Sequence, residues 1–282
     1  MYRLRSPARA SGSPFAARLF GLFYIFLLTV AGGAEAGVTA RFETRDLQRG
    51  SSENGRLLAQ EGHYRMDRLE GDTLVASVLL KEGKSYVIDH AKKFWSVVDA
   101  EALKQMEADL QLSAAAFDQR VAAMDPKQRS MIVDAVAGSA PAGAARKVEA
   151  TGEQEEKSGF PATRYQITSD GTLVREIWAT PWAKVPAALE LQSAQSAMEA
   201  YYQRLTSIFA NVKSQLLGIP VYDSPENPFA DFGKIDGFAV VTKNFAEGRS
   251  LAETRLLEVK EGDIPAAEFE LPAGYAQKAM ND

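Results

Sequence analysis

The chain has 282 residues, of which 46% are hydrophobic and 24% charged, a balance typical of a globular protein. Its formal net charge is −5, and loss of residues 1–36 would remove four arginines and one glutamate and lower it to −8. An acidic chain without a basic stripe is poorly suited to phosphate backbones, which excludes nucleic acid as the expected partner. The chain has no cysteine, so it has neither disulfides nor a lipid-acceptor thiol.

The N-terminus has the pattern of a cleavable signal peptide. Arg3 to Arg18 is basic and free of acids, Leu19–Val30 is apolar, and Ala34-Glu35-Ala36 is a small-x-small cleavage signal. The apolar run makes roughly 18 Å of helix, short of the ~30 Å hydrocarbon core, although an uncleaved anchor is the alternative. We therefore expect cleavage after Ala36, no membrane span afterwards, and a periplasmic or secreted mature protein.

Short strands with turn signals follow from Gly37. The expected strands are Val38–Thr44, Arg56–Gln60, Tyr64–Leu69, Thr73–Lys81, Ser85–Asp89 and Phe94–Val98. Ser51–Gly55 reads as a turn, and Gly83-Lys84 suits a tight hairpin. Near the C-terminus, strands are expected over Gly237–Asn244, Leu251–Lys260 and Ala267–Leu271. This spacing indicates antiparallel pairing rather than alternating βαβ units.

Two helical insertions interrupt the strands, at about 99–136 and 186–217. The first is expected to begin at the N-cap Asp99, run to Met124 and restart at Pro126. A small-residue linker follows over 137–145. The second insertion runs from Pro186 to Leu217, with Gly218 after its end. We expect the Asp99–Met124 helix to lie over the sheet.

Residues 158–182 predict one hairpin, with Asp170-Gly171 as a type I′ turn between Ala162–Thr168 and Thr172–Ala179. The simplest register pairs Thr168 with Leu173, Tyr165 with Glu176, and Thr163 with Trp178. This register places a set of apolar side chains on one face of the sheet and a set of polar and apolar side chains on the opposite face. The apolar set is Tyr165, Ile167, Val174 and Trp178, and the mixed set includes Arg164, Arg175 and Ile177.

Several short motifs resemble known exported proteins. The stretch from Lys84 to Trp95 (KSYVIDHAKKFW) resembles the strand-turn-strand of the LolA/LppX lipoprotein-carrier superfamily. Gly159–Tyr165 with Ile177-Trp178, the Met-containing helix pair, and Phe269–Tyr275 resemble an exported bacterial family of unknown function. The resemblance implies an α+β fold for a single domain over 37–282. This fold is a curved antiparallel half-barrel whose inserted helices cover its concave face.

No catalytic or metal pattern is present. His63 and His90 are the only histidines, lack a metal or triad pattern, and read as solvated turn residues. Asp223, Glu226 and Asp231 lack the spacing of a calcium loop and read as solvated loop charges. We therefore expect no enzyme activity, catalytic residue, metal or cofactor.

An aromatic set alternates along the strands and is either core or the lining of an apolar groove. The expected ligand-binding residues are Tyr64, Met66, Tyr86, Trp95, Phe117, Tyr165 and Trp178. The leading hypothesis is an exported, non-enzymatic binding protein that holds a lipid or lipidated partner in the half-barrel. The alternative is an envelope protein-protein interaction or structural module whose core is filled by its own side chains.

Overall fold

The computed structural model describes residues 36–129, 146–213, 229, 231–246 and 248–279, without the side chains of 110, 114 and 208–213. The first strands are β1 (Val38–Asp46), β2 (Ser51–Gln60), β3 (His63–Glu70), β4 (Thr73–Lys81), β5 (Lys84–Asp89) and β6 (Phe94–Val97). After helix α2 (Ala100–Ala122) come β7 (Arg146–Lys157), β8 (Phe160–Ser169) and β9 (Thr172–Thr180). Helix α4 (Ala188–Lys213), β10 (Phe238–Ala246), β11 (Arg249–Glu261) and β12 (Ala276–Gln277) complete the fold.

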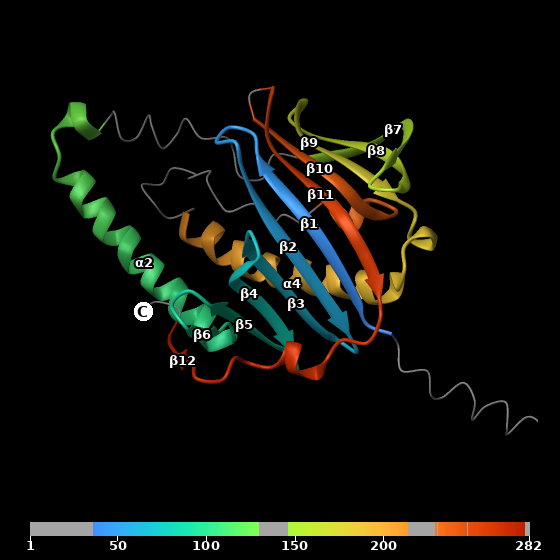
Figure 1. The fold of residues 1–282 in the computed structure, drawn as a ribbon. Coiled ribbons are helices and arrows are strands. Elements are labelled where there is room, and N and C mark those ends of the chain that lie inside the picture. Colours follow the sequence, from blue (N-terminus) through green and yellow to red (C-terminus); the bar gives the residue numbers. More distant parts are fainter. Residues whose placement is uncertain (1–35, 130–145, 214–228, 230, 247, 280–282) are drawn as a thin grey trace, which may run out of the picture. The chain divides into compact units, whose positions relative to one another are not determined.

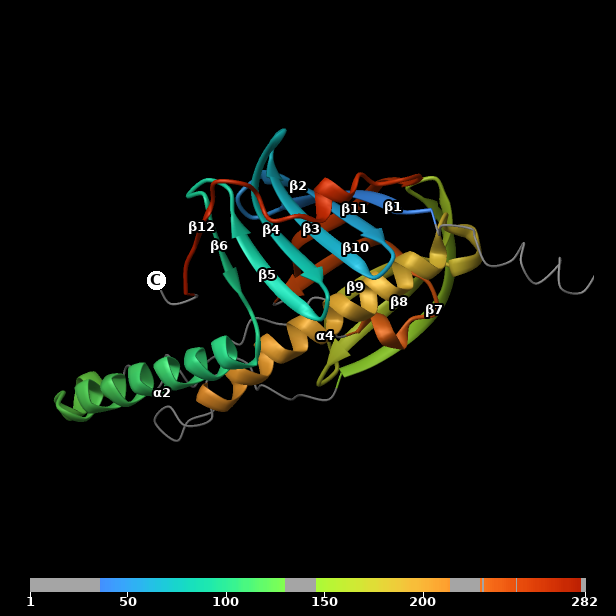
Figure 2. The same ribbon diagram turned by 90° about the horizontal axis from the view of Figure 1, so that it is seen from below.

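The described strands form one open sheet in the order β12-β6-β5-β4-β3-β2-β1-β11-β10-β9-β8-β7. Every neighbouring pair is antiparallel except β12 with β6. The sheet is curved, and α4 lies across its concave side (Figures 1 and 2). The predicted α+β class, a curved antiparallel sheet with helices inserted between its strands, is confirmed.

The strand register assigns each side chain to one of two faces, because residues directly opposite each other point the same way. One row runs across six strands through Ala40, Leu57, Met66, Val78, Val87 and Ser96. These residues and their i±2 neighbours form the helix face, which meets α4. The adjacent row on the other side, here the outer face, contains Arg56, Asp67, Ser77, Ile88 and Trp95.

Helix α4 covers the helix face with an apolar stripe. Leu191 and Ala194 pack against Ala40 and Ala59, and Met198 and Tyr201 belong to a second cluster with Leu80 and Val98. The spacing of these four α4 residues by three or four positions brings them onto one side of the helix. The helix extends to Lys213, and the expected final turn at 214–217 lies outside the described residues.

Helix α2 does not cover the sheet, so that expectation is wrong. Its predicted N-cap is confirmed, because Asp99 Oδ1 accepts a hydrogen bond from Ala102 N at 2.9 Å. Leu103 in the first turn packs with Val98 and Met198, but α2 then runs along α4 and away from the strands (Figure 2). Phe117, on the apolar stripe of α2, is 37% exposed, whereas a helix lying over the sheet would bury that stripe.

Two other local predictions are wrong. Ser51–Gly55 belongs to β2, where Ser51 pairs with Asp46, because pairing along β1 overrides the local turn preference. The turn lies earlier, where Asp46 Oδ1 accepts hydrogen bonds from Gln48 N and Arg49 N, both at 2.9 Å. Ala267–Leu271 is not a strand: Ala266–Phe269 forms a short 3-10 helix, and the last strand is β12.

The predicted hairpin is β8-β9, but its register changes within the strands. Asp170 (φ 49°) and Gly171 (φ 78°) both have the positive φ that a type I′ turn requires, and Thr168 pairs with Leu173 as expected. A bulge between Ile167 and Thr168 then shifts the pairing by one residue. Beyond it, the predicted partners and faces in β9 are therefore wrong.

The C-terminal segment covers the outer face. Ile264 and Phe269 pack on Leu58, Leu79 and Ile88, and Tyr275 borders the same cluster. Backbone hydrogen bonds from Ala276 N to Lys93 O (3.1 Å) and from Lys278 N to Trp95 O (2.9 Å) hold the end of the segment beside β6. This segment therefore supplies the cover that α2 was expected to provide, but on the opposite face.

Some predictions fall outside the described residues. These are the signal segment up to residue 35, most of the second helix at 126–136, and the linker at 137–145. From Gly37 onward the described residues form one compact unit. Within them, no helix is both long and apolar enough to cross a bilayer.

Candidate functional site

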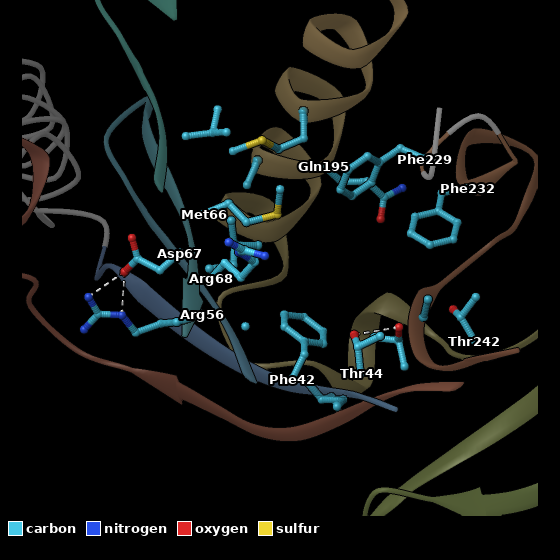
Figure 3. Close-up of a pocket in the computed structure, with 18 of the residues that line it drawn as sticks. Phe42, Thr44, Arg56, Met66, Asp67, Arg68, Gln195, Phe229, Phe232 and Thr242 are labelled. Carbon is cyan, nitrogen blue, oxygen red and sulfur yellow. Dashed lines mark hydrogen bonds and ion pairs between the residues drawn. The ribbon is translucent and has the colours of Figure 1, made fainter. Parts of the chain in front are cut away.

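A pocket of about 450 Å³ lies between α4 and the helix face of the sheet (Figure 3). Its floor comes from β1–β5 and β9–β11, its roof from α4, and one side from Phe229 and Phe232. This volume is within the range of about 300–1,000 Å³ that is usual for small-molecule sites. Most of the lining is apolar: Phe42, Leu57, Met66, Val78, Val87, Leu191, Ala194, Met198, Tyr202, Phe238, Val240 and Leu256.

Small side chains leave this space open. One row of directly opposed residues runs across β1–β4 through Phe42, Gly55, Arg68 and Ala76. Two of these four residues, Gly55 and Ala76, have little or no side chain. A Cβ atom built on Gly55 would meet its nearest neighbours only at 3.8 Å. On the roof, Ala194 lies between the larger Leu191 and Met198. The pocket is therefore encoded by residues too small to fill the space between helix and sheet.

The lining becomes polar toward β9–β11. Thr44, Thr254 and Thr242 lie directly opposite one another on three neighbouring strands, and Thr44 Oγ1 and Thr254 Oγ1 are 3.0 Å apart. Figure 3 shows Thr44 and Thr242 on the same side of the pocket. The next row adds the pair Asn244 and Arg175. The site thus has an apolar part and a polar part.

Arg175 is a buried charge of this lining. Its side chain is inside the fold, with the residue only 5% exposed, and its Nε donates to Asn244 Oδ1 at 2.9 Å. Its Nη1 donates to Asp231 Oδ2 at 3.1 Å, and the same oxygen accepts from Arg146 Nη1 at 2.9 Å. Asp231 is therefore buried in an ion-pair cluster, and its interpretation as a solvated loop charge is wrong.

Two tyrosines also lie at the roof. Tyr201 is buried against the sheet, and Tyr202 lines the pocket beside Phe229, with ring centroids 5.4 Å apart. Burial raises the pKa of both phenols, so they remain neutral donors throughout the physiological range.

The seven expected ligand-binding residues do not gather in one groove. Met66 lines the pocket, and Tyr64 packs next to it between the sheet and α4. Burial raises the pKa of Tyr64. Tyr165 lies on the helix face opposite Ile177, in a separate cluster with Ile167 and Ile235.

The other four point elsewhere. Tyr86 and Trp95 lie on the outer face, 6.0 Å apart in an edge-to-face contact, beneath the C-terminal segment. Trp178 is not part of the pocket lining but is 4% exposed in the buried cluster that also contains Val241, Leu191 and Ala194. Its Nε1 donates to Glu176 Oε1 at 3.0 Å, and Lys157 Nζ lies 4.5 Å from its ring. Phe117 is 37% exposed on α2.

A polar cluster on the outer face contains His90. Its Nε2 is 2.8 Å from Ser77 Oγ, and its Nδ1 is 3.1 Å from the hydroxyl of Tyr275. Ser77 Oγ donates to Asp67 Oδ1 at 2.6 Å, and Asp67 is paired with both Arg56 and Arg65. His90 is thus half-buried and bonded on both nitrogens, so its interpretation as a solvated turn histidine is wrong.

This cluster is not a nucleophilic site. Ser77 is only 2% exposed, and its hydroxyl lies between His90 and Asp67, whereas a catalytic triad places the histidine between the serine and the acid. Among the residues that the structure describes, no group of three or more histidines and acids could hold a metal ion.

The fold and the pocket define a class of protein: a curved antiparallel sheet with an apolar pocket under a covering helix. The sequence matches no model of a known protein family and no curated protein. Among solved structures, an uncharacterized conserved protein from Thermus thermophilus aligns over 91% of this chain and 98% of its own, with 9% identity and a TM-score of 0.44.

The Pseudomonas aeruginosa MucA/MucB complex aligns over 86% of this chain and 56% of the matched one, with 12% identity and a TM-score of 0.37. A putative outer membrane lipoprotein-sorting protein domain from Vibrio parahaemolyticus covers 88% of this chain and 95% of its own, with 9% identity and a TM-score of 0.27. Similarities at this level do not define a function, which must be inferred from the pocket itself.

Proposed function

We propose that this protein is an exported, non-enzymatic binding protein that holds the acyl chain of a lipid or lipidated partner in the pocket under α4. The observation that supports this proposal is the apolar cavity of about 450 Å³ between α4 and the helix face. Each methylene group transferred from water into such a site contributes roughly 0.8 kcal/mol. An acyl chain suits this lining, because aliphatic and aromatic side chains from several strands surround the cavity. The floor row Leu57, Met66, Val78 and Val87 contains no polar side chain.

The alternative is an envelope interaction module with a core filled by its own side chains. That alternative requires side chains to occupy the space under α4, and the described residues leave it open. The volume of the pocket therefore favours the binding proposal.

A pocket-filling substitution tests the proposal. Ala76 lines the pocket, and Ala76→Phe would place a ring in it. Ala150→Phe is the matched control, because Ala150 is exposed on the edge strand β7. Fluorescence titration with cis-parinaric acid, a naturally fluorescent fatty acid, should give saturable binding to the native chain and to Ala150→Phe, and at least about tenfold weaker binding to Ala76→Phe.

Circular dichroism would confirm that both variants are folded. The absence of saturable binding to the folded native chain, or equal binding to both variants, would contradict the proposal.

A further inference from the structure

The exposure of the strands under α4 locates an open end of the pocket. Along β3, Tyr64 and Met66 pack against the cluster that contains α4, whereas the side chain of Arg68, further along the same face, is 52% exposed. Along β2, the same face leads from Ala59, which is fully buried, to Glu53, whose side chain is 50% exposed. Both strands therefore run from beneath the helix to a mouth of the pocket, defined by Arg68 and Glu53.

The register places the side chain of Arg68 on the pocket side of the sheet. Arg68 lies directly opposite Gly55 on one neighbouring strand and Ala76 on the other, and both of these line the pocket. Figure 3 shows Arg68 next to Met66 and separate from the ion pair on the outer face. Since neither direct neighbour has a side chain longer than a methyl group, there is room for a ligand beside the guanidinium.

Arg68 and Glu53 form a loose ion pair at the mouth. The distance from Arg68 Nη1 to Glu53 Oε1 is 3.6 Å, longer than the roughly 2.7–2.9 Å of a charge-assisted hydrogen bond. Half-exposed pairs of this kind contribute little to stability, because water and salt screen them. A ligand can therefore separate the two charges and bind both of them at small cost.

Two opposite charges side by side select a head group that carries both. The guanidinium of Arg68 can donate two parallel hydrogen bonds to a phosphate, and the carboxylate of Glu53 can accept hydrogen bonds from an ammonium group. An anionic head group bound at Arg68 would be repelled by Glu53, and a cationic one bound at Glu53 would be repelled by Arg68.

The apolar floor of the pocket begins directly beside this mouth. Met66 precedes Arg68 by two residues on β3, and Leu57 and Val78 stand opposite Met66 on the neighbouring strands. Residues two positions apart on a strand lie next to each other on one face of the sheet. A head group at Arg68 therefore places its acyl chain on the apolar row without crossing a polar region.

We propose that the pocket binds a zwitterionic phospholipid, with its phosphate at Arg68, its amine at Glu53 and an acyl chain along the row from Leu57 to Val87. This inference rests on the proposed function and adds the class of the lipid and its orientation. It is carried by the position of a loose ion pair at the exposed end of an apolar floor, on the same face of the sheet.

The first test varies the head group and needs no mutant. Lysophosphatidylethanolamine, lysophosphatidylglycerol and monoacylglycerol, all with a myristoyl chain, have a zwitterionic, an anionic and an uncharged head group. Each would compete with cis-parinaric acid for the native protein near neutral pH, below its critical micelle concentration. The zwitterion should compete at least about fivefold more strongly than either of the others, because it alone pairs with both charges.

Equal competition by the three lipids, or stronger competition by the anionic or the uncharged one, would overturn the inference and leave the proposed function intact. Failure of all three to displace bound cis-parinaric acid would do the same. If cis-parinaric acid itself does not bind, the proposed function fails.

The second test removes one charge of the mouth at a time. Glu53→Gln leaves the guanidinium alone and should reverse the preference, so that lysophosphatidylglycerol competes better than lysophosphatidylethanolamine. Arg68→Gln removes the phosphate contact and should abolish the advantage of lysophosphatidylethanolamine over monoacylglycerol. Because both side chains are half exposed, neither substitution leaves an isolated buried charge.

Glu258→Gln is the matched control. Glu258 pairs with Lys260 on β11, with Nζ and Oε1 2.8 Å apart, and is not part of the pocket lining. This variant should keep the native preference, and circular dichroism would confirm that all three variants are folded. Loss of the preference in Glu258→Gln, or its retention in folded Glu53→Gln and Arg68→Gln, would overturn the assignment of the head group to this mouth.

Discussion

His90 occupies a site where a single proton changes the electrostatics of the outer face. Burial lowers the pKa of His90 below its ordinary value of 6.5, with Arg65 acting in the same direction and the carboxylates of Asp67 and Asp89 against it. Ser77 and the Tyr275 hydroxyl face its two nitrogens. The neutral imidazole is therefore the form that this cluster stabilises.

The first prediction concerns stability against pH. Because the pKa is lower in the folded state, the unfolded chain binds more protons, and stability rises with pH in this range. The contribution of His90 should be complete above about pH 6.5 and should be lost as the pH falls through the folded-state pKa. Denaturant unfolding of the native chain between pH 7.5 and pH 5, compared with His90→Gln, measures it.

His63→Gln is the matched variant, since it removes the only other histidine. The native loss of stability on acidification should persist in His63→Gln and be smaller in His90→Gln. An equal loss in all three proteins would show that the cluster does not respond to His90.

Arg175 illustrates what the sequence could not reveal at the scale of residues. The turn at Asp170-Gly171 was predictable, because the two residues are typical of positive φ. The bulge between Ile167 and Thr168 has no local signal, and one extra residue moves Arg175 and Ile177 to the face of Tyr165. Phe42 and Met198 could be placed on apolar stripes, but not in the lining of one pocket, because that depends on how the helix packs on the sheet.

Among the elements, α2 and α4 have similar apolar spacing but different environments. Leu191 of α4 is fully buried, whereas Phe117 of α2 is 37% exposed. Periodicity indicates which side of a helix is apolar, but it does not identify what that side contacts. For the same reason, the motif Phe269–Tyr275 could be recognised in the sequence without its position on the outer face.

The second prediction compares these two helices. Leu191→Ala should lower the free energy of unfolding by about 2–5 kcal/mol, because it leaves a cavity between α4 and the sheet. Phe117→Ala should lower it by about 0.5 kcal/mol or less, as for substitutions near the surface. Equilibrium unfolding in urea measures both, and equal costs would contradict the separate environments of α2 and α4.

For the molecule as a whole, hairpin spacing was sufficient to predict an antiparallel sheet. It could not predict the strand order, in which β1 lies between β2 and β11, because pairing between distant strands leaves no local pattern. Nor could composition indicate that both faces of the sheet would be covered in part, one by α4 and the other by the C-terminal segment.

The third prediction concerns processing. The mature chain should begin at Gly37, because Ala34 and Ala36 form the small-x-small signal. N-terminal sequencing of the exported protein measures this. Ala36→Leu should block cleavage and leave a longer product, whereas Ala31→Leu, outside the signal, should not. A native product that retains the Leu19–Val30 run would contradict the prediction.

The pairing of β1 with β11 has a consequence for how the protein is made. Val38 stands opposite Glu261, so the second partner of β1 is synthesised only after β2–β10. Until then the emerging chain can assemble β1–β6, but the edge of β1 that will receive β11 has exposed backbone donors and acceptors. The native sheet can therefore be completed only after β11 has left the ribosome or translocation channel, and the nascent protein must be protected from aggregation throughout that interval.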